Sequence, residues 1–199
     1  MSDPREAVHE QAVDGFGTVR ILPLDPHTDA DVVHAWVSEE RAAFWGMTGL
    51  TRDQVAEIYA HLDTLDTHHA FLVQRDGVPA ALLQTYEPEA DRVSEVYEVR
   101  PGDIGVHLLL APAAPEGARH GWTAGLLAAI TEYVLLGLDR QRIVVDPDIR
   151  NEKAIARFLK QGFEEGPAVT LPEIDIPDVY LPEKKAQLAF LNRAVAFPG

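Results

Sequence analysis

Stretches in which apolar residues alternate with other residues, or form short continuous runs, predict the strands of this chain. These stretches are residues 18–24, 69–74, 78–86, 104–110, 142–145, 163–171 and 180–191. The polar segment Arg75-Asp76-Gly77 separates two of them, and an Asp-Gly turn between apolar runs is a strong signal for a β-hairpin. About seven strands are therefore expected.

Apolar residues at helical spacing predict four helices between these strands. The first begins near Asp29 or Asp31, the second begins at Thr51, and the others span residues 122–138 and 151–161. The third helix is apolar on nearly all sides, which predicts that it packs against a sheet and is covered by other elements.

The segments outside these elements complete the predicted organisation. Gly162 is expected to end the last helix in a left-handed conformation. Residues 1–16 are expected to form a loosely ordered lead-in, and residues 87–101 a polar loop. The order of elements predicts one domain over residues 1–199 with an α/β (mixed α+β) fold, in which helices cover the faces of a mixed sheet.

Composition and charge narrow the possible functions. The chain has 199 residues, a formal net charge of −15 and no cysteine, which excludes disulfides, thiolate catalysis and cysteine-ligated metals. The acidity disfavours binding to nucleic acid or to anionic membranes and suits a cationic small molecule, although it also serves solubility. The polar N-terminus and the lack of a long apolar run predict a cytoplasmic protein without a membrane span.

A glycine-containing loop, residues 115–123, precedes the third helix. Gly117 and Gly121 allow close approach of a ligand to the backbone, and Arg119 adds a positive charge. Because the first N–H groups of a helix are unpaired donors at its positive end, this loop is a candidate site for a phosphate or pyrophosphate. Such loops are common, so the signal is weak when taken alone.

The following strand and helix carry a more specific pattern, Asn-x-x-Ala-x-x-x-Phe-x-x-x-Gly-Phe, from Asn151 to Phe163. Together with the preceding strand, loop and helix, this pattern resembles the GNAT acyltransferase superfamily. The resemblance implies a twisted central sheet whose strands splay apart in the middle, with acyl-CoA bound along one strand and its pyrophosphate on the loop. The loop departs from the usual family pattern, since Ala118 and Thr123 stand at its first and sixth positions.

A closer resemblance is to the siderophore-biosynthesis branch of this superfamily, carried by Phe44-Trp45-Gly46-Met47, by Gly102-Asp103-Ile104-Gly105-Val106-His107, by Asp146-Pro147-Asp148-Ile149-Arg150-Asn151 and by Tyr180-Leu181-Pro182. It implies an N-acyltransferase of hydroxamate siderophore biosynthesis, and hence of iron acquisition. The acyl donor would be acetyl-CoA or succinyl-CoA, with no metal, and the acceptor an N-hydroxylated diamine such as N-hydroxycadaverine. The protein would act as a monomer or homodimer.

The resemblance also implies which residues contact the cofactor and which catalyse the reaction. The expected cofactor-binding residues lie on the strand, the loop and the two helices: Leu108, Leu109, Leu110, Gly117, Arg119, His120, Gly121, Trp122, Thr123, Asn151, Ala154 and Phe158. His107 and Asp148 would be the catalytic residues. Imidazole titrates near neutral pH and suits a general base, whereas position alone would make His107 a core histidine and Asp148 a helix cap.

The acceptor is expected to need an apolar wall for its aliphatic chain and a polar lining for its remote ammonium. Candidates for these contacts are Trp36, Phe44, Trp45, Met47, Gln84 and Glu87. The aromatic residues also suit ordinary core packing, and the acidic Glu87 also suits a solvated face. Two alternatives remain open: a lysine or N6-hydroxylysine N6-acyltransferase, and a non-catalytic CoA-binding module with the same fold.

Overall fold

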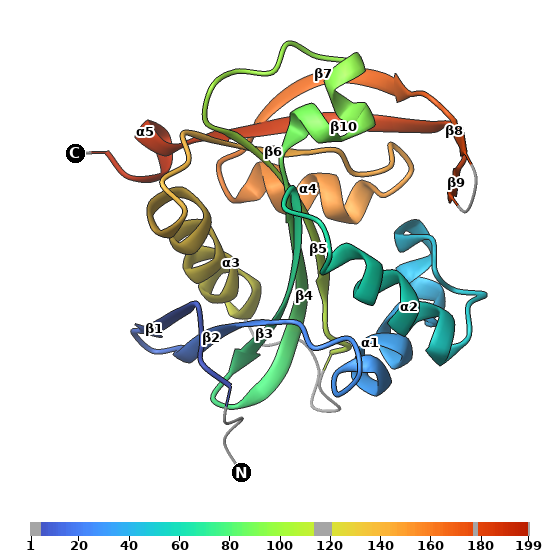
Figure 1. The fold of residues 1–199 in the computed structure, drawn as a ribbon. Coiled ribbons are helices and arrows are strands. Elements are labelled where there is room, and N and C mark those ends of the chain that lie inside the picture. The colour runs from blue at the N-terminus through green and yellow to red at the C-terminus, as the bar shows by residue number, and fades with distance from the viewer. Residues whose placement is uncertain (1–4, 114–120, 177–178, 199) are drawn as a thin grey trace. The chain divides into compact units, whose positions relative to one another are not determined.

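The structure is a computed structural model that describes residues 5–113, 121–176 and 179–198 (Figure 1). The chain forms two compact units. The first comprises Met1–Thr85 and His107–Tyr133, and the second Tyr86–Val106 and Val134–Gly199. The single domain expected over residues 1–199 stays a prediction.

The first unit is built on strands in the order β1-β2-β3-β4, with the carboxyl-terminal part of β5 beside β4. Its elements are β1 (His9–Val13), β2 (Gly17–Pro23), α1 (Ala30–Val37), the 3-10 helix η1 (Glu40–Trp45), α2 (Arg52–Leu62), β3 (His68–Arg75), β4 (Val78–Tyr86), β5 (Asp103–Leu110) and α3 (Trp122–Glu132).

The second unit contains the amino-terminal part of β5 and the strand order β5-β6-β10-β7. Its further elements are η2 (Pro88–Ala90), η3 (Arg92–Glu95), the π-helical turn η4 (Tyr133–Gly137), β6 (Arg142–Val145), α4 (Glu152–Lys160), β7 (Glu164–Leu171), β8 (Ile174–Ile176), β9 (Val179–Leu181), β10 (Lys184–Asn192) and α5 (Arg193–Ala196). Strands β8 and β9 form a separate antiparallel pair.

The predicted mixed sheet with helices is confirmed. Strand β5 pairs with β6 in parallel, whereas β10 pairs antiparallel with both β6 and β7. The parallel pairing covers only Asp103–Gly105 of β5, although the strand continues to Leu110. The described strands number eight in the main sheet and two in the separate pair, compared with the seven expected.

Local signals in the sequence correctly locate several turns and caps. Asp76 and Gly77 have φ angles of 50° and 78°, as a type I′ hairpin turn between β3 and β4 requires. Thr51 caps α2 in a reciprocal capping box with Gln54. Gly162 follows α4 with a φ of 91°, the left-handed conformation expected there.

Three predicted segments differ from the structure. Residues 1–16 are not simply a loose lead-in, because His9–Val13 forms strand β1, paired antiparallel with β2. The predicted strand 180–191 is divided at Pro182 into β9 and β10, since proline has no N–H to donate to a ladder. The helix predicted over residues 122–138 is α-helical only to Glu132 and continues as the π-helical turn η4.

Helices cover both faces of the sheet in the first unit. Leu72 and Leu82 pack with Val33, Val55 and other side chains of α1 and α2. The neighbouring residue Phe71 instead contacts Tyr133, just after α3, with ring centroids 5.5 Å apart. Adjacent strand residues point to opposite faces, so α1 and α2 cover one face and α3 the other, where it contacts β1 and β2 (Figure 1).

The core of the second unit includes Tyr86, Val93, Leu171, Ala186 and Leu188. Glycine at position 105 makes room for this packing, because a Cβ there would overlap the Tyr86 ring. At the other side of the sheet, α4 contributes the buried Phe158, whose ring lies 5.1 Å from that of Phe163. No helix among the described residues is long and apolar enough to cross a membrane.

Candidate functional site

His107 lies on β5 in the first unit and is half-buried, so its ring is neither sealed in the core nor fully solvated. Its Nδ1 is 3.4 Å from Oε1 of Gln84, on the neighbouring strand β4. The Trp45 ring stands edge-on to the imidazole, with centroids 6.3 Å apart and an interplanar angle of 75°. His107 is therefore held by a polar contact on one ring nitrogen and an aromatic contact on the ring.

Tyr59 connects the partners of His107. Its side chain is buried, and its hydroxyl oxygen accepts hydrogen bonds from Trp45 Nε1 at 3.2 Å and from Gln84 Nε2 at 3.1 Å. Burial raises the pKa of Tyr59 well above its ordinary value, so the phenol keeps its proton throughout the physiological range. The sequence predicts Tyr59 only as an apolar-face residue of α2, although a buried tyrosine needs a hydrogen-bond partner.

The predicted acceptor-binding residues separate into two groups. The first group lies at the end of η1 and just after it. Phe44 is 43% exposed there, and Trp45 and Met47 are half-buried. Trp36, in contrast, is only 6% exposed and packs within the core against residues such as Val55. Its ring stabilises the packing of α1, and its assignment as an acceptor contact stays a prediction.

Glu87, predicted as a contact of the acceptor ammonium, forms an ion pair with Arg140. Both of its carboxylate oxygens accept hydrogen bonds from the Arg140 guanidinium, one at 3.0 Å from Nη1 and the other from Nη2. The negative charge of Glu87 is thus already balanced by a bidentate ion pair within the second unit. This contact fixes the start of the segment after β4.

Asp148 follows β6 in the second unit and forms an ion pair with Arg150. Its Oδ1 and Oδ2 accept hydrogen bonds from the guanidinium at 2.9 and 2.8 Å, and Oδ1 also accepts from the Arg150 backbone N–H. These bonds hold the pKa of Asp148 below its ordinary value. A carboxylate with a lowered pKa is a weaker base than a free one, and the catalytic role expected for Asp148 stays a prediction.

A second carboxylate near the end of β6 was not expected as part of a site. Asp146 is buried, and it accepts hydrogen bonds from Lys184 Nζ at 2.8 Å and from the Tyr86 hydroxyl at 3.2 Å. Burial, and after it the charge of Asp146, raises the pKa of Tyr86. An aspartate directly after an apolar strand was the only sequence signal for this network.

The residues expected to hold the cofactor on α4 have structural partners. Asn151 is the N-cap of α4, and its side chain accepts a hydrogen bond from the Ala154 N–H at 3.2 Å. Phe158 is 7% exposed and stacks on Phe163, so its ring belongs to the core. The sequence analysis gives helix capping as an alternative role of Asp148. The structure has Asn151 as the N-cap of α4 instead.

The strand and loop expected to bind acyl-CoA belong to the first unit where they are described. Leu109 packs in the core, whereas Leu108 and Leu110 are half-buried, and the Leu110 carbonyl accepts a hydrogen bond from Arg41 at 2.7 Å. The predicted residues Gly117, Arg119 and His120 lie outside the described residues.

Gly121, at the start of α3, is the part of this loop that the structure describes. It is the N-cap with a φ of 79°, and among the described residues no side chain caps the helix. The first N–H groups of a helix are unpaired donors, to which an anionic group can bind. The described end of the loop fits a pyrophosphate in this respect.

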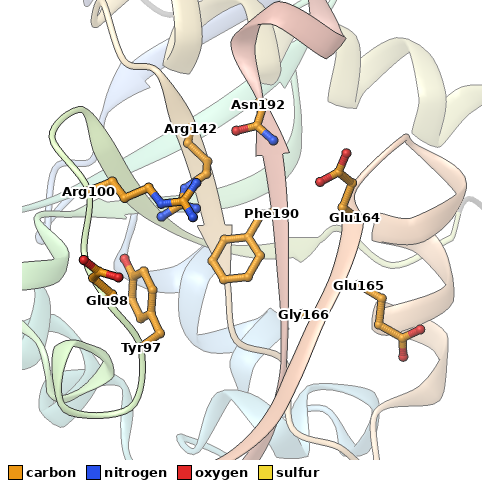
Figure 2. A pocket seen from close by; sticks show the side chains of 9 residues that line it. All are labelled: Tyr97, Glu98, Arg100, Arg142, Glu164, Glu165, Gly166, Phe190 and Asn192. Carbon is orange, nitrogen blue, oxygen red and sulfur yellow. The ribbon is translucent and has the colours of Figure 1, made fainter.

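A cavity of about 340 Å³ in the second unit is separate from all of these residues (Figure 2). Phe190 stands between Tyr97 on one side and Glu164 on the other, and the Arg142 guanidinium lies 4.7 Å from the Phe190 ring centroid. Arg142 also makes a buried bidentate ion pair with Asp103, with contacts of 2.6 and 2.7 Å. The cavity contains none of the predicted site residues.

Comparison with known proteins adds to this geometry. A model of the acetyltransferase (GNAT) domain matches residues 25–171 of the chain. The chain is 29% identical over 175 residues to the N(6)-hydroxylysine O-acetyltransferase of Escherichia coli, covering 85% of this chain and 50% of that protein. It is 26% identical over 83 residues to the N-hydroxyputrescine acetyltransferase of Acinetobacter baumannii, covering 42% of this chain and 38% of that protein.

The fold is also found in solved structures. An aminoglycoside acetyltransferase in complex with coenzyme A superposes with a TM-score of 0.71 at 25% identity, covering 89% of this chain and 96% of that one. The chain spans about half the length, or less, of the two curated relatives described above.

Proposed function

Because the chain belongs to the GNAT acetyltransferase family, we propose that it transfers an acyl group from acyl-CoA to the nitrogen of an N-hydroxylated diamine such as N-hydroxycadaverine. The transferred group is acetyl, succinyl or a similar acyl group, and the product is a hydroxamate of the kind used in siderophores. The half-buried imidazole of His107 beside Gln84 and Trp45 is the observation that carries this proposal.

The chemistry requires a neutral nitrogen nucleophile and a base. Acyl-CoA supplies a thioester carbonyl, and the acceptor nitrogen adds to its carbon. The carbon–sulfur bond then breaks, and CoA leaves as a thiolate that takes up a proton to become the free thiol. His107 takes the proton that the acceptor nitrogen loses as it forms the new carbon–nitrogen bond. A hydroxylamine is much less basic than an alkylamine and is mostly unprotonated near neutral pH, so a single imidazole is a sufficient base.

The charge of the chain supports a cationic acceptor. With a net charge of −15, the protein attracts a molecule that carries an ammonium group at its far end. The exposed Phe44 and the half-buried Trp45 and Met47 offer apolar surface for an aliphatic chain in the same unit as His107. Asp148, which pairs with Arg150 in the second unit, stays the second proposed catalytic residue.

The test is a panel of acetyl-CoA and succinyl-CoA against cadaverine, N-hydroxycadaverine, lysine and N6-hydroxylysine. The proposal predicts thiol release that depends on N-hydroxycadaverine and a product that gives a coloured complex with ferric iron, because a hydroxamate chelates iron and an O-acylated hydroxylamine does not. Thiol release with no hydroxylamine among the active acceptors would contradict the proposal. Silence across the panel, with donor binding intact, would instead favour a non-catalytic CoA-binding module.

A second candidate is acylation of N6-hydroxylysine or lysine. The match over 175 residues to a protein named as an N(6)-hydroxylysine O-acetyltransferase favours it. The two candidates differ in whether the acceptor carries an α-carboxylate. A preference for N6-hydroxylysine over N-hydroxycadaverine of tenfold or more in kcat/KM, about 1.4 kcal/mol of transition-state binding, would decide for this second candidate.

A further inference from the structure

We propose that Gln84 and Tyr59 are positioning residues that hold His107 in one tautomer, with the proton on Nδ1 and the lone pair on Nε2. The sequence predicts Gln84 as a contact of the acceptor, but its amide lies between His107 and Tyr59. The inference deepens the proposed function and rests on it only for the statement that His107 is the base.

The backbone sets Gln84 opposite His107. The Ala111 N–H donates to the Ala80 carbonyl at 2.9 Å. Gln84 comes four residues after Ala80 in the chain, and His107 comes four residues before Ala111. This is the spacing of an antiparallel pair, in which directly opposite residues point to the same face. The contact therefore follows from the register of β4 and β5 and not from two mobile side chains meeting.

The Gln84 amide directs its nitrogen to Tyr59 and its oxygen to His107. Trp45 Nε1 is only a donor, so the Tyr59 oxygen accepts from it, and the same oxygen accepts from Gln84 Nε2. With its nitrogen directed to Tyr59, the amide presents Oε1 to the imidazole, and an oxygen without a proton can only accept. The ring nitrogen that faces it, Nδ1, must then carry the proton.

The neutral amide has a consequence for the acceptor class. A carboxylate in the place of Gln84 would stabilise the imidazolium and make a stronger base, as an alkylammonium acceptor requires. An amide orients the ring without adding a charge. This arrangement suits a nitrogen that is already unprotonated, and it supports a hydroxylamine acceptor over a simple amine.

The direct test is the ¹⁵N chemical shifts of the imidazole nitrogens in the whole protein without substrate, near neutral pH. His107→Ala identifies the His107 resonances among those of the eight histidines. A protonated Nδ1 with an unprotonated Nε2 is expected, and Gln84→Leu should shift the ring toward the other tautomer. A His107 protonated on Nε2 in the unchanged protein, as a reversed Gln84 amide would produce, would overturn the inference.

The kinetic test uses three substitutions and one matched control. Gln84→Leu is expected to lower kcat about 10- to 100-fold while changing the KM for acyl-CoA less than about threefold, within the total contribution of a general base. Tyr59→Phe is expected to lower kcat by about three- to tenfold. Tyr133→Phe removes another buried phenol of the same unit, away from His107, and should leave kcat unchanged.

Gln84→Glu is the conservative variant that protects the test against simple misfolding. It keeps an acceptor for Nδ1–H, so it should retain the tautomer and move the acidic limb of the pH–rate profile to higher pH. If kcat, tautomer and pH profile are all unmoved by Gln84→Leu while His107→Ala is inactive, the inference fails and the proposed function stands. If His107→Ala is fully active, the proposed base fails, while the NMR result still decides the tautomer.

Discussion

Replacement of Gly105 by alanine should destabilise the second unit more than its single methyl group suggests. A Cβ at this position would overlap ring atoms of Tyr86, which is 2% exposed and cannot turn into solvent. The ring must move, and its movement lengthens the hydrogen bond from the Tyr86 hydroxyl to the buried Asp146 carboxylate, now 3.2 Å. The change therefore disturbs both packing and a buried polar contact.

The size of the effect follows from these two losses. Overpacking of a close-packed core costs about 1–3 kcal/mol, and loss of a hydrogen bond to a charged group about 1.5–3 kcal/mol. Their sum predicts a free energy of unfolding lower by about 2.5–6 kcal/mol. For a chain of this size, the midpoint of thermal unfolding should fall by roughly 5–24 °C.

The assay is urea unfolding followed by both circular dichroism and tryptophan fluorescence, since coincident transitions are needed for one free energy. Gly49→Ala is the control, because a Cβ at Gly49 would meet nothing within 4 Å. In a Tyr86→Leu background, the cost of Gly105→Ala should fall below about 1.5 kcal/mol. A Gly105→Ala protein within about 0.5 kcal/mol of the unchanged chain would refute the packing argument.

Three further changes test other contacts. Arg142→Met leaves the Asp103 carboxylate buried without its bidentate partner and should cost about 3–5 kcal/mol in urea unfolding, much of it recovered by adding Asp103→Asn. Thr51→Ala removes the capping box of α2 and should lower the free energy of unfolding by about 1 kcal/mol; no change in the urea midpoint would argue against the cap. The ion pair with Arg150 lowers the pKa of Asp148, so its stabilisation is present above the unfolded value of about 3.9 and is lost as the pH falls through the folded value. Asp148→Asn should therefore lower the urea midpoint near neutral pH and have a smaller effect near pH ~3, and an equal effect at both would contradict the pairing.

Elements with a strong local cause were predictable from the sequence. The Asp76-Gly77 turn, the cap at Thr51 and the left-handed Gly162 each depend on residues adjacent in the chain, and the structure has all three. Strand β1 was missed because its residues alternate between half-buried and exposed, and its one neighbour in the sheet is β2. A weakly apolar edge strand carries little pattern for sequence analysis to detect.

Roles that depend on a distant partner were harder to predict. The sequence cannot show that Arg140 neutralises Glu87, 53 residues earlier, or that Trp36 rather than Phe44 enters the core. Likewise, Gln84 is an ordinary polar residue of a strand until the register of β4 and β5 sets it against His107. Such contacts are fixed by tertiary packing, which periodicity and motif spacing describe only in outline.

The place of His107 on a strand, in contrast, could be predicted from the sequence. A histidine within an apolar strand, in a segment that resembles a family pattern, stands out among its neighbours. The structure places this residue on β5 with a polar partner, and it places Asp148 in an ion pair after β6. The two predicted catalytic residues thus have different surroundings, and these surroundings support the proposal that His107 is the base.

Acceptor-dependent release of thiol from acetyl-CoA, measured for the unchanged protein and for His107→Ala with N-hydroxycadaverine, tests the central claim most directly. The account predicts rapid release only when the acceptor is present, and a loss of about 10²- to 10⁴-fold in kcat for His107→Ala, with the KM for acetyl-CoA nearly unchanged. Equal kcat in the two proteins, or release that does not depend on the acceptor, would contradict it.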